Sequence, residues 1–266
     1  MRLCSAARAI LAAAYAAIAH GSSWAQTGPQ HWGMIGGMAA RNQMLDSVAQ
    51  RLAKLESRHT VRVGIDGVDA AGKTTFADEL SDRLRALGRA VIRSGIDGFH
   101  HPRQVRYARG SESPEGYYHD SFDLGRLVEM LLRPLGPGGT AYYRRAIFDY
   151  RLDAPVDSPE MKAEPEAILL FDGIFLLRPQ LRPFWDFTIF VRADFDVTLR
   201  RALVRDLSLL GDAAKIEQRY LSRYVPAQKI YLAECGPETN ANLVIDNNDP
   251  SNPFVIAPLQ SGAQDG

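Results

Sequence analysis

The chain has 266 residues, a length that suits one α/β domain with short additions. It holds 31 Lys plus Arg and 31 Asp plus Glu, so it lacks the basic excess of a nucleic-acid-binding protein. No apolar run reaches the ~18 residues of a membrane span. Cys4 and Cys235 have no metal-type spacing and predict no disulfide framework. We therefore expect neither nucleic acid nor membrane as a partner, and a homo-oligomer is left open.

Residues 1–33 differ in composition from the rest of the chain. Arg2 and Arg8 precede an apolar run at 9–19 and a small-x-small end at 23–25, a pattern typical of an exported protein's signal peptide. The alternative is a mis-assigned start, with translation beginning at Met34 or later. We favour this alternative, and hence a cytoplasmic protein, because the remainder shows no secreted character such as paired cysteines. In either case the segment lies outside the predicted fold.

The first predicted elements lead to a glycine-rich loop. Apolar residues recur at helical spacing from Met38 to Leu55, and a strand-type run follows at 61–65. Gly67, four residues, Gly72, Lys73 and Thr74 then form the phosphate loop, or Walker A motif. Apolar residues at helical spacing follow it to about residue 87. The four fixed positions of the phosphate-loop motif arise by chance in roughly 1% of chains of this length, so an accidental glycine turn is the weaker interpretation.

The loop chemistry predicts a bound nucleoside triphosphate. Glycines let successive N–H groups face phosphate oxygens, and the next helix adds the positive end of its dipole. We expect Lys73, exposed in the loop, to reach the β- and γ-phosphates and the Thr74 hydroxyl to ligate Mg²⁺. The predicted nucleotide-binding residues are Gly67, Asp69, Ala70, Ala71, Gly72, Lys73, Thr74 and Thr75.

Polar residues follow the second predicted strand, at 89–94. Open α/β sheets bind ligands beyond the carboxyl ends of their strands, so Asp97 is a candidate functional carboxylate. The alternative is an aspartate that caps a turn. The segment 113–123 is rich in aromatic residues and carries Asp120 and Asp123. For Asp123 the alternative is a cap on the helix predicted at 124–132.

An apolar run at 167–171 followed by Asp172 predicts a buried parallel strand with a Walker-B-type carboxylate, which we expect to hold Mg²⁺ with Thr74.

Further strands are expected at 187–191 and 242–246. Between them, a helix at 195–207 places Arg201 and Arg205 one turn apart. A solvated face is one explanation. We favour a mobile lid at about 205–225 that brings arginines over the triphosphate.

The predicted fold is a three-layer α/β/α arrangement with a parallel five-stranded core sheet, because a parallel sheet needs helices on both faces. The domain is expected to span 38–250, with 251–266 as a flexible tail.

These segments together resemble a known family. The phosphate loop, Asp-Gly-Phe-His at 97–100, Phe-Asp-Gly-Ile at 171–174, the 198–206 helix and the last strand resemble the uridine kinase, phosphoribulokinase and pantothenate kinase group over about residues 60–248. The likeness is greatest to bacterial uridine kinase-like chains, and 97–116 also resembles the pantothenate kinase pattern.

The resemblance implies a P-loop kinase that uses ATP and Mg²⁺, with Asp97 as general base. The catalytic residues that it implies are Asp97, Lys73, Arg201 and Arg205. The acceptor-binding residues are expected to be His100, Arg103, Tyr118, Asp120, Asp123 and Arg151. The expected reaction transfers the γ-phosphate of ATP to a nucleoside hydroxyl, with uridine first. The alternatives are a pantothenate- or sugar-type acceptor, or a nucleotide-binding regulatory ATPase without a small acceptor.

Two departures from the family pattern leave uridine open. Nucleoside-specific members have a Tyr-Asp pair and a nearby histidine, whereas residues 148–151 read Phe-Asp-Tyr-Arg here and the histidine is missing. The lid arginine that usually follows the Arg-Asp pair is also absent. Leu210 and Gly211 stand in its place, with Arg219 or Arg223 as candidate replacements.

Overall fold

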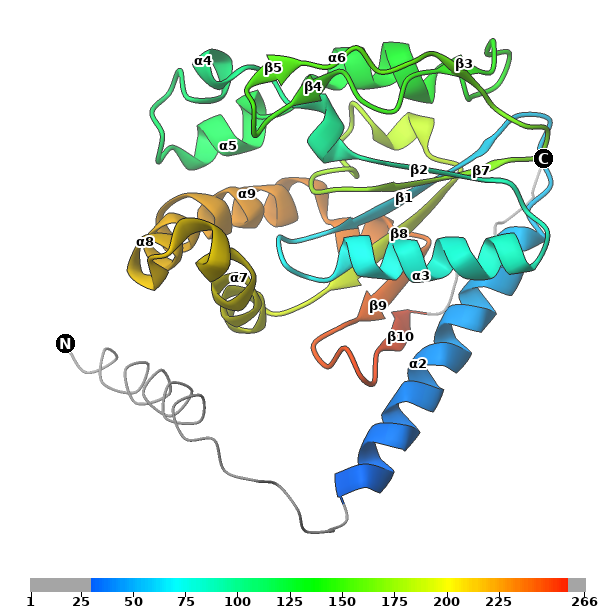
Figure 1. The fold of residues 1–266 in the computed structure, drawn as a ribbon, viewed down its shortest axis with the longest axis horizontal. Helices are drawn as coiled ribbons and strands as arrows, with labels where there is room; N and C mark the ends of the chain where they lie inside the picture. The colour runs from blue at the N-terminus through cyan, green and yellow to red at the C-terminus, as the bar shows by residue number, and fades with distance from the viewer. Residues whose placement is uncertain (1–29, 258–266) are drawn as a thin grey trace. The chain divides into compact units, whose positions relative to one another are not determined.

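The computed structural model describes residues 30–257 (Figure 1). Contacts divide the chain into Met1–Gly36 and Gly37–Gly266, and the description below concerns the second unit. The signal-like segment expected at 1–33 lies almost entirely outside the described residues. Within 30–257, no helix combines the length and apolar character that crossing a membrane requires.

The main sheet has six strands in the order β10-β9-β8-β1-β7-β2. The strands are β1 (Val61–Gly67), β2 (Val91–Gly95), β7 (Ile168–Asp172), β8 (Phe187–Arg192), β9 (Leu243–Asp246) and β10 (Phe254–Ala257). The first five are parallel, whereas β10 pairs antiparallel with β9. The prediction of five strands was therefore one short, because β10 lies in the segment expected to be a tail. This edge strand is four residues long and largely exposed, so its sequence carries little periodic signal.

Helices cover both faces of this sheet, as predicted (Figure 1). Side chains alternate along β7, so that Ile168 and Leu170 pack with α2 (Gln30–Ala53) and α3 (Lys73–Ala86). Leu169 and Phe171 instead join the core under α6 (Leu124–Leu127). The three-layer α/β/α architecture follows from this two-sided burial.

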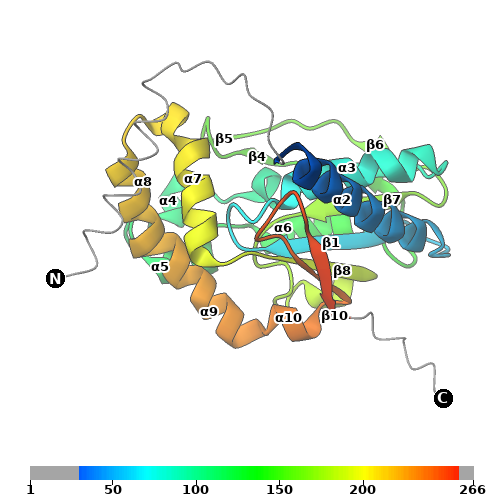
Figure 2. The ribbon, with the colours of Figure 1, turned by 90° about the horizontal axis from the view of Figure 1, so that it is seen from below.

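The remaining elements lie outside the main sheet. The lid predicted at about 205–225 falls on the end of α7 (Phe195–Leu210), on α8 (Ala213–Arg219) and on a π-helical turn at Tyr220–Tyr224, and α7 and α8 lie side by side (Figures 1 and 2). The short helices are α4 (Arg103–Arg106), α5 (Pro114–Asp120) and α10 (Pro237–Asn240), and α9 (Val225–Cys235) follows the lid. A π-helical turn at Val128–Leu132 extends α6, and 3-10 turns occupy Ile96–Phe99 and Arg182–Phe184. Two small hairpins pair β3 (Tyr142–Tyr143) with β6 (Met161–Lys162) and β4 (Phe148–Asp149) with β5 (Ala154–Pro155).

A partly buried ion pair joins β1 to the turn before β8. The Arg62 guanidinium donates through Nε and Nη2 to the two carboxylate oxygens of Asp186, each at 2.9 Å. The Arg62 backbone N–H also donates to Asp186, at 2.8 Å. Burial alone would raise the pKa of Asp186, but these hydrogen bonds outweigh it and lower that pKa. The pair therefore stabilises the junction between two central strands.

We expect Asp186→Asn to destabilise the fold by about 2 kcal/mol, below the 3–5 kcal/mol of a fully buried pair because a quarter of the Asp186 side chain is exposed. Since the folded pKa is lowered, this stabilisation is complete above the unfolded pKa of about 4 and is lost as pH falls through the folded value. Urea denaturation from pH 3 to 7 should show a steeper loss of stability with acid in the wild type than in the variant, which lacks the Asp186 contribution. The control is Asp196→Asn, which removes the exposed Arg200–Asp196 pair and should change stability by less than about 0.5 kcal/mol.

Candidate active site

The loop between β1 and α3 has the backbone conformation that phosphate binding requires. Ala70 (φ 57°) and Gly72 (φ 96°) are left-handed, which turns successive N–H groups toward the inside of the loop. A Cβ at Gly72 would lie 2.6 Å from Nδ2 of Asn247, the atom that donates to the Ala71 carbonyl at 2.6 Å. Glycine is therefore required at position 72 both for its φ angle and for the space it leaves.

Lys73 is buried rather than exposed in the loop, contrary to the sequence-based expectation. It is the first residue of α3, and its Nζ donates to the Val68 carbonyl at 2.7 Å. Burial lowers the pKa of Lys73, and the nearby carboxylates, foremost Asp69 and Asp66, oppose this shift. The loop thus curls around its lysine and keeps the ammonium group inside the phosphate-binding turn.

Asp66 is a site residue that the sequence analysis missed. Its carboxylate is fully buried behind the loop, where it accepts hydrogen bonds from Tyr231 Oη and from the Gly67 N–H (2.7 Å). Burial raises the pKa of Asp66, while the Tyr231 hydrogen bond opposes the rise. An aspartate at the end of a buried strand, next to a glycine loop, was the available signal. Its partner lies 165 residues away and could not be identified from spacing.

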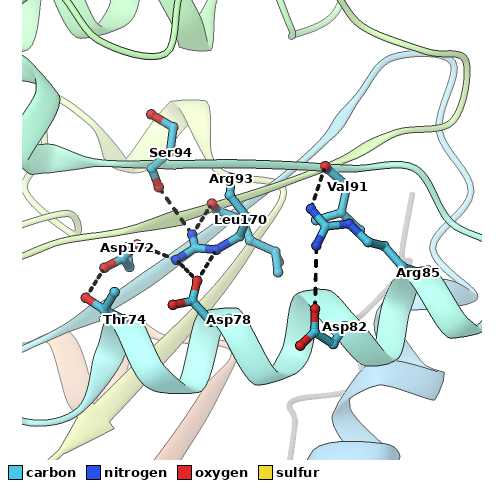
Figure 3. Close-up of polar contacts among 9 residues, drawn as sticks. All are labelled: Thr74, Asp78, Asp82, Arg85, Val91, Arg93, Ser94, Leu170 and Asp172. Carbon is cyan, nitrogen blue, oxygen red and sulfur yellow. Dashed lines mark hydrogen bonds and ion pairs between the residues drawn. The ribbon is translucent and has the colours of Figure 1, made fainter.

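Thr74 and Asp172 meet at the carboxyl end of β7, as predicted. The Thr74 hydroxyl donates to Asp172 Oδ2 at 2.6 Å (Figure 3). Among the described residues, no three His, Cys, Asp or Glu side chains form a metal-binding group. Mg²⁺ in phosphate-transfer sites is typically held by one or two protein oxygens together with phosphates and water. The donors present fit that pattern.

A cavity of about 650 Å³ opens beside the loop at the carboxyl edge of the sheet. It brings together residues from the loop, the ends of β2 and β7, and the lid helix α7. Its lining includes the predicted residues Asp69, Ala70, Gly72, Lys73, Thr74, Thr75, Asp97, His100, Asp172, Arg201 and Arg205. It also includes Tyr117, Phe122 and Arg145, which the sequence analysis did not select.

Asp97 lies in the 3-10 turn directly after β2 and faces this cavity. Asp97 is solvent-exposed where it lines the cavity, although protein atoms crowd its carboxylate. Desolvation by these neighbours, with the negative charge of Asp172, raises the pKa of Asp97, while Lys73 and Arg151 act in the opposite direction. Asp97 therefore binds a proton more readily than an ordinary aspartate does. Its position and raised pKa suit a general base for a hydroxyl acceptor.

His100 and Arg151 lie near Asp97 in different ways. The His100 ring lies between Phe122 and Tyr150, with centroid distances of 4.5 and 4.7 Å. Burial lowers the pKa of His100 to about 4, so the ring is neutral at pH 7. Arg151 does not line the cavity. Its guanidinium lies 5.7 Å from the Tyr150 ring centroid, and its charge acts on Asp97.

The other predicted acceptor-binding residues lie outside the cavity lining. Tyr118 is buried against Cys235, and Tyr117 lines the cavity instead and donates to Asp69 at 3.0 Å. Consecutive helical residues point about 100° apart, so only one of the two tyrosines can face the site. Asp123 accepts from the Arg126 N–H at 2.9 Å and caps α6. This is the helix-capping role that the sequence offered as the alternative to acceptor binding.

Asp120 and Arg103 also make contacts away from the lining. Asp120 accepts from Arg109 Nε at 2.7 Å, and the Arg103 N–H donates to Asp153 at 2.8 Å. Both residues lie at the ends of short helices, and these contacts are made with residues that do not line the cavity.

Helix α7 contributes Arg201 and Arg205 to the cavity wall. Arg201 donates to the carbonyls of Asn247 (2.8 Å) and Asn248 (3.0 Å), and Arg205 donates to Asp206 and Tyr220. Arg223 was a candidate to replace the missing lid arginine, but it is buried, with its guanidinium 4.7 Å from the Tyr107 ring centroid. Arg219 does not line the cavity either.

The family model described as phosphoribulokinase / uridine kinase family matches residues 62–248. The chain belongs to this family. Uridine-cytidine kinase B of Dictyostelium discoideum is 32% identical over 158 residues, which cover 58% of this chain and 62% of that protein. The uridine kinase of Leuconostoc citreum is 28% identical over 200 residues, covering 68% of this chain and 89% of that protein.

A solved structure supports the same fold. The structure described as a possible uridine kinase from Bacillus stearothermophilus has a TM-score of 0.61 and 24% sequence identity. The match covers 76% of this chain and 97% of the chain in that structure. The family match and the named relatives indicate the activity, and the phosphate loop and the carboxylate-bearing cavity agree with it. The chain is an ATP-dependent phosphotransferase that acts on a hydroxyl group.

We expect Lys73→Ala to weaken binding of Mg·AMP-PNP about 10- to 100-fold, because a hydrogen bond to a charged group contributes about 1.5–3 kcal/mol. Isothermal titration calorimetry measures the affinity, and far-UV circular dichroism should remain unchanged. Lys54→Ala removes an exposed lysine near the end of α2 and serves as the control, with wild-type affinity expected. Equal affinities for the Lys73 variant and the wild type would contradict a phosphate-binding role.

Proposed function

We propose that the chain transfers the γ-phosphate of ATP to a hydroxyl group of a nucleoside, with uridine as the first candidate. The observation that carries this proposal is the convergence of Lys73, Asp97 and the Thr74–Asp172 pair on one cavity. A switch protein needs the phosphate loop alone, whereas a carboxylate placed across the cavity from it suits a second, small substrate. The matched relatives named uridine kinase or uridine-cytidine kinase support the choice of acceptor.

The phosphate end of the cavity supplies positive charge. Lys73, held inside the loop, would contact the β- and γ-phosphates, and the loop N–H groups would bind their remaining oxygens. Thr74 and Asp172 would hold Mg²⁺, which neutralises charge on the transferring group. Arg201 and Arg205 extend from α7 to the same wall and would stabilise the charge that spreads over the phosphoryl oxygens.

Asp97 would act on the acceptor. Its carboxylate would accept a hydrogen bond from the attacking hydroxyl, orient it, and take its proton as transfer proceeds. The raised pKa of Asp97 makes it a better proton acceptor than an ordinary aspartate, provided that it is deprotonated when the acceptor binds. The positive charge of Lys73 favours that deprotonated form.

Aromatic side chains favour a planar acceptor. Phe122 and His100 line the cavity next to Asp97, and the neutral His100 ring adds no charge that would select an anion. Flat, weakly polar surfaces of this kind suit a nucleobase, while the carboxylate suits a sugar hydroxyl. Because residues 148–151 lack the histidine pattern of nucleoside-specific members, pantothenate and free sugars belong in the same test.

We expect uridine to increase ADP formation from Mg·ATP at least 100-fold over the rate without an acceptor, as two substrates held in register react far faster than ATP with water. A coupled assay should compare uridine and cytidine with pantothenate and free sugars, and mass spectrometry should identify a monophosphate. Stimulation by pantothenate or a sugar alone would reassign the acceptor. A rate independent of every compound would favour a regulatory ATPase.

We expect Asp97→Asn to lower kcat by ~10²–10⁴ with the preferred acceptor, the usual contribution of a positioned base. Because the base acts deprotonated and its pKa is raised, wild-type kcat/KM should fall as pH drops through a value above the ordinary ~4 of aspartate. The variant should lack this acid limb. Asp120→Asn breaks the Arg109 ion pair outside the cavity and should retain near-wild-type kcat. A turn-capping role predicts instead that Asp97→Asn stays active, because asparagine also caps.

A further inference from the structure

Arg93 contacts the predicted metal-binding carboxylate and was not selected by any sequence motif. Its Nη2 donates to Asp172 Oδ1 at 2.9 Å, while the Thr74 hydroxyl donates to Oδ2 at 2.6 Å (Figure 3). Each carboxylate oxygen therefore has its own donor. With both oxygens engaged, rotation of the carboxylate would break at least one hydrogen bond.

The sheet register brings Arg93 to this position. On the parallel strands β2 and β7, Arg93 pairs with Leu170 and Gly95 pairs with Asp172. Residues two apart share a face of the sheet, so the Arg93 side chain can extend across position 95 toward Asp172. A Cβ at Gly95 would lie 3.3 Å from Asp172 Oδ1. Glycine at position 95 therefore avoids crowding the Asp172 backbone and carboxylate, which a Cβ would meet at 3.0–3.3 Å.

The Arg93 guanidinium is itself held on two further sides. Asp78 on α3 accepts from Nε at 3.0 Å and from Nη2 at 2.9 Å, and the Leu170 carbonyl accepts from Nη1 at 2.8 Å. Only 18% of the Arg93 side chain is exposed. A guanidinium fixed by a helix and by the neighbouring strand can transmit that rigidity to Asp172.

Asp78 also balances the charge of Arg93. An unpaired guanidinium next to Asp172 would repel a divalent cation, because like charges a few ångströms apart destabilise each other. The Asp78 carboxylate, which accepts from the same Nη2 as Asp172 does, brings the net charge of the Arg93–Asp78 pair to zero. The pair can therefore orient Asp172 without adding net positive charge beside the metal position.

We propose that Arg93 is a positioning residue that fixes the Asp172 carboxylate for a divalent cation, with Asp78 as its counter-ion. The inference rests on the proposed function, since it takes Thr74 and Asp172 as the metal ligands. Partners that orient a metal ligand typically change metal affinity 10- to 100-fold when they are removed.

The test is the charge-neutral double variant Arg93→Met with Asp78→Asn. Mn²⁺ is the probe, and electron paramagnetic resonance measures its binding to the protein in the presence of AMP-PNP. We expect the double variant to bind Mn²⁺ about tenfold or more weakly, with no change in AMP-PNP affinity without metal. Because the net charge is unchanged, a loss of affinity reports the orientation of Asp172 and not long-range charge.

The same helix offers a matched control. Arg85 pairs with Asp82 on α3 (3.6 Å) and donates to the Val91 carbonyl on β2 (3.5 Å), without contacting Asp172 (Figure 3). The double variant Arg85→Met with Asp82→Asn removes the same pair of charges and should bind Mn²⁺ as the wild type does. Arg93→Lys, which keeps one donor but loses the planar fork, should bind with intermediate affinity.

Asp172→Asn separates this inference from the proposed function. If neither the wild type nor Asp172→Asn binds Mn²⁺ with AMP-PNP, the metal site itself is refuted. If the wild type binds and Asp172→Asn does not, while the Arg93 double variant stays within threefold of the wild type, only the role of Arg93 is overturned. Should the double variant fail to fold, the same threefold limit applies to Arg93→Lys.

Discussion

The buried ammonium group of Lys73 is the constraint on which the site depends. A charged group removed from water is costly unless opposite charges compensate it. Here the compensating carboxylates, in decreasing order of effect, are Asp69, Asp66, Asp172 and Asp97. They come from the phosphate loop, the end of β1, the end of β7 and the turn after β2. The charge of one lysine is therefore compensated by carboxylates from three strand ends and a loop, all at the same edge of the sheet.

The same arrangement makes the acids unusual. Burial raises the pKa values of Asp66 and Asp69, and Asp97 follows them because of desolvation and the nearby Asp172. The positive charge of Lys73 offsets the mutual repulsion of the carboxylates that surround it. The arrival of a triphosphate would add negative charge, so the phosphate loop N–H groups, a metal and the lid arginines are needed to balance it.

Hydrogen bonds connect this charged centre to distant helices. Asp69 donates its N–H to Gln228 Oε1 at 2.9 Å and accepts from Gln228 Nε2 at 3.0 Å, a two-point clamp from α9. Tyr117 on α5 donates to the same carboxylate, and Tyr231 on α9 donates to Asp66. Helices α5 and α9 are thus bonded directly to the carboxylates of Asp69 and Asp66 beside Lys73.

The sequence by itself determined the phosphate loop, the parallel strands, the two-sided burial and the Thr74–Asp172 pair. These depend on local patterns: fixed spacing within the loop, alternation along strands, and an apolar run that ends in an acid. The tertiary structure alone decided that Tyr117 rather than Tyr118 faces the cavity, that Lys73 is buried, and that β10 completes the sheet. It also decided that Arg93 and Asp66 belong to the site, because their partners lie 79 and 165 residues away. Contacts across such separations depend on strand register and helix rotation, which a single sequence does not encode in any local spacing.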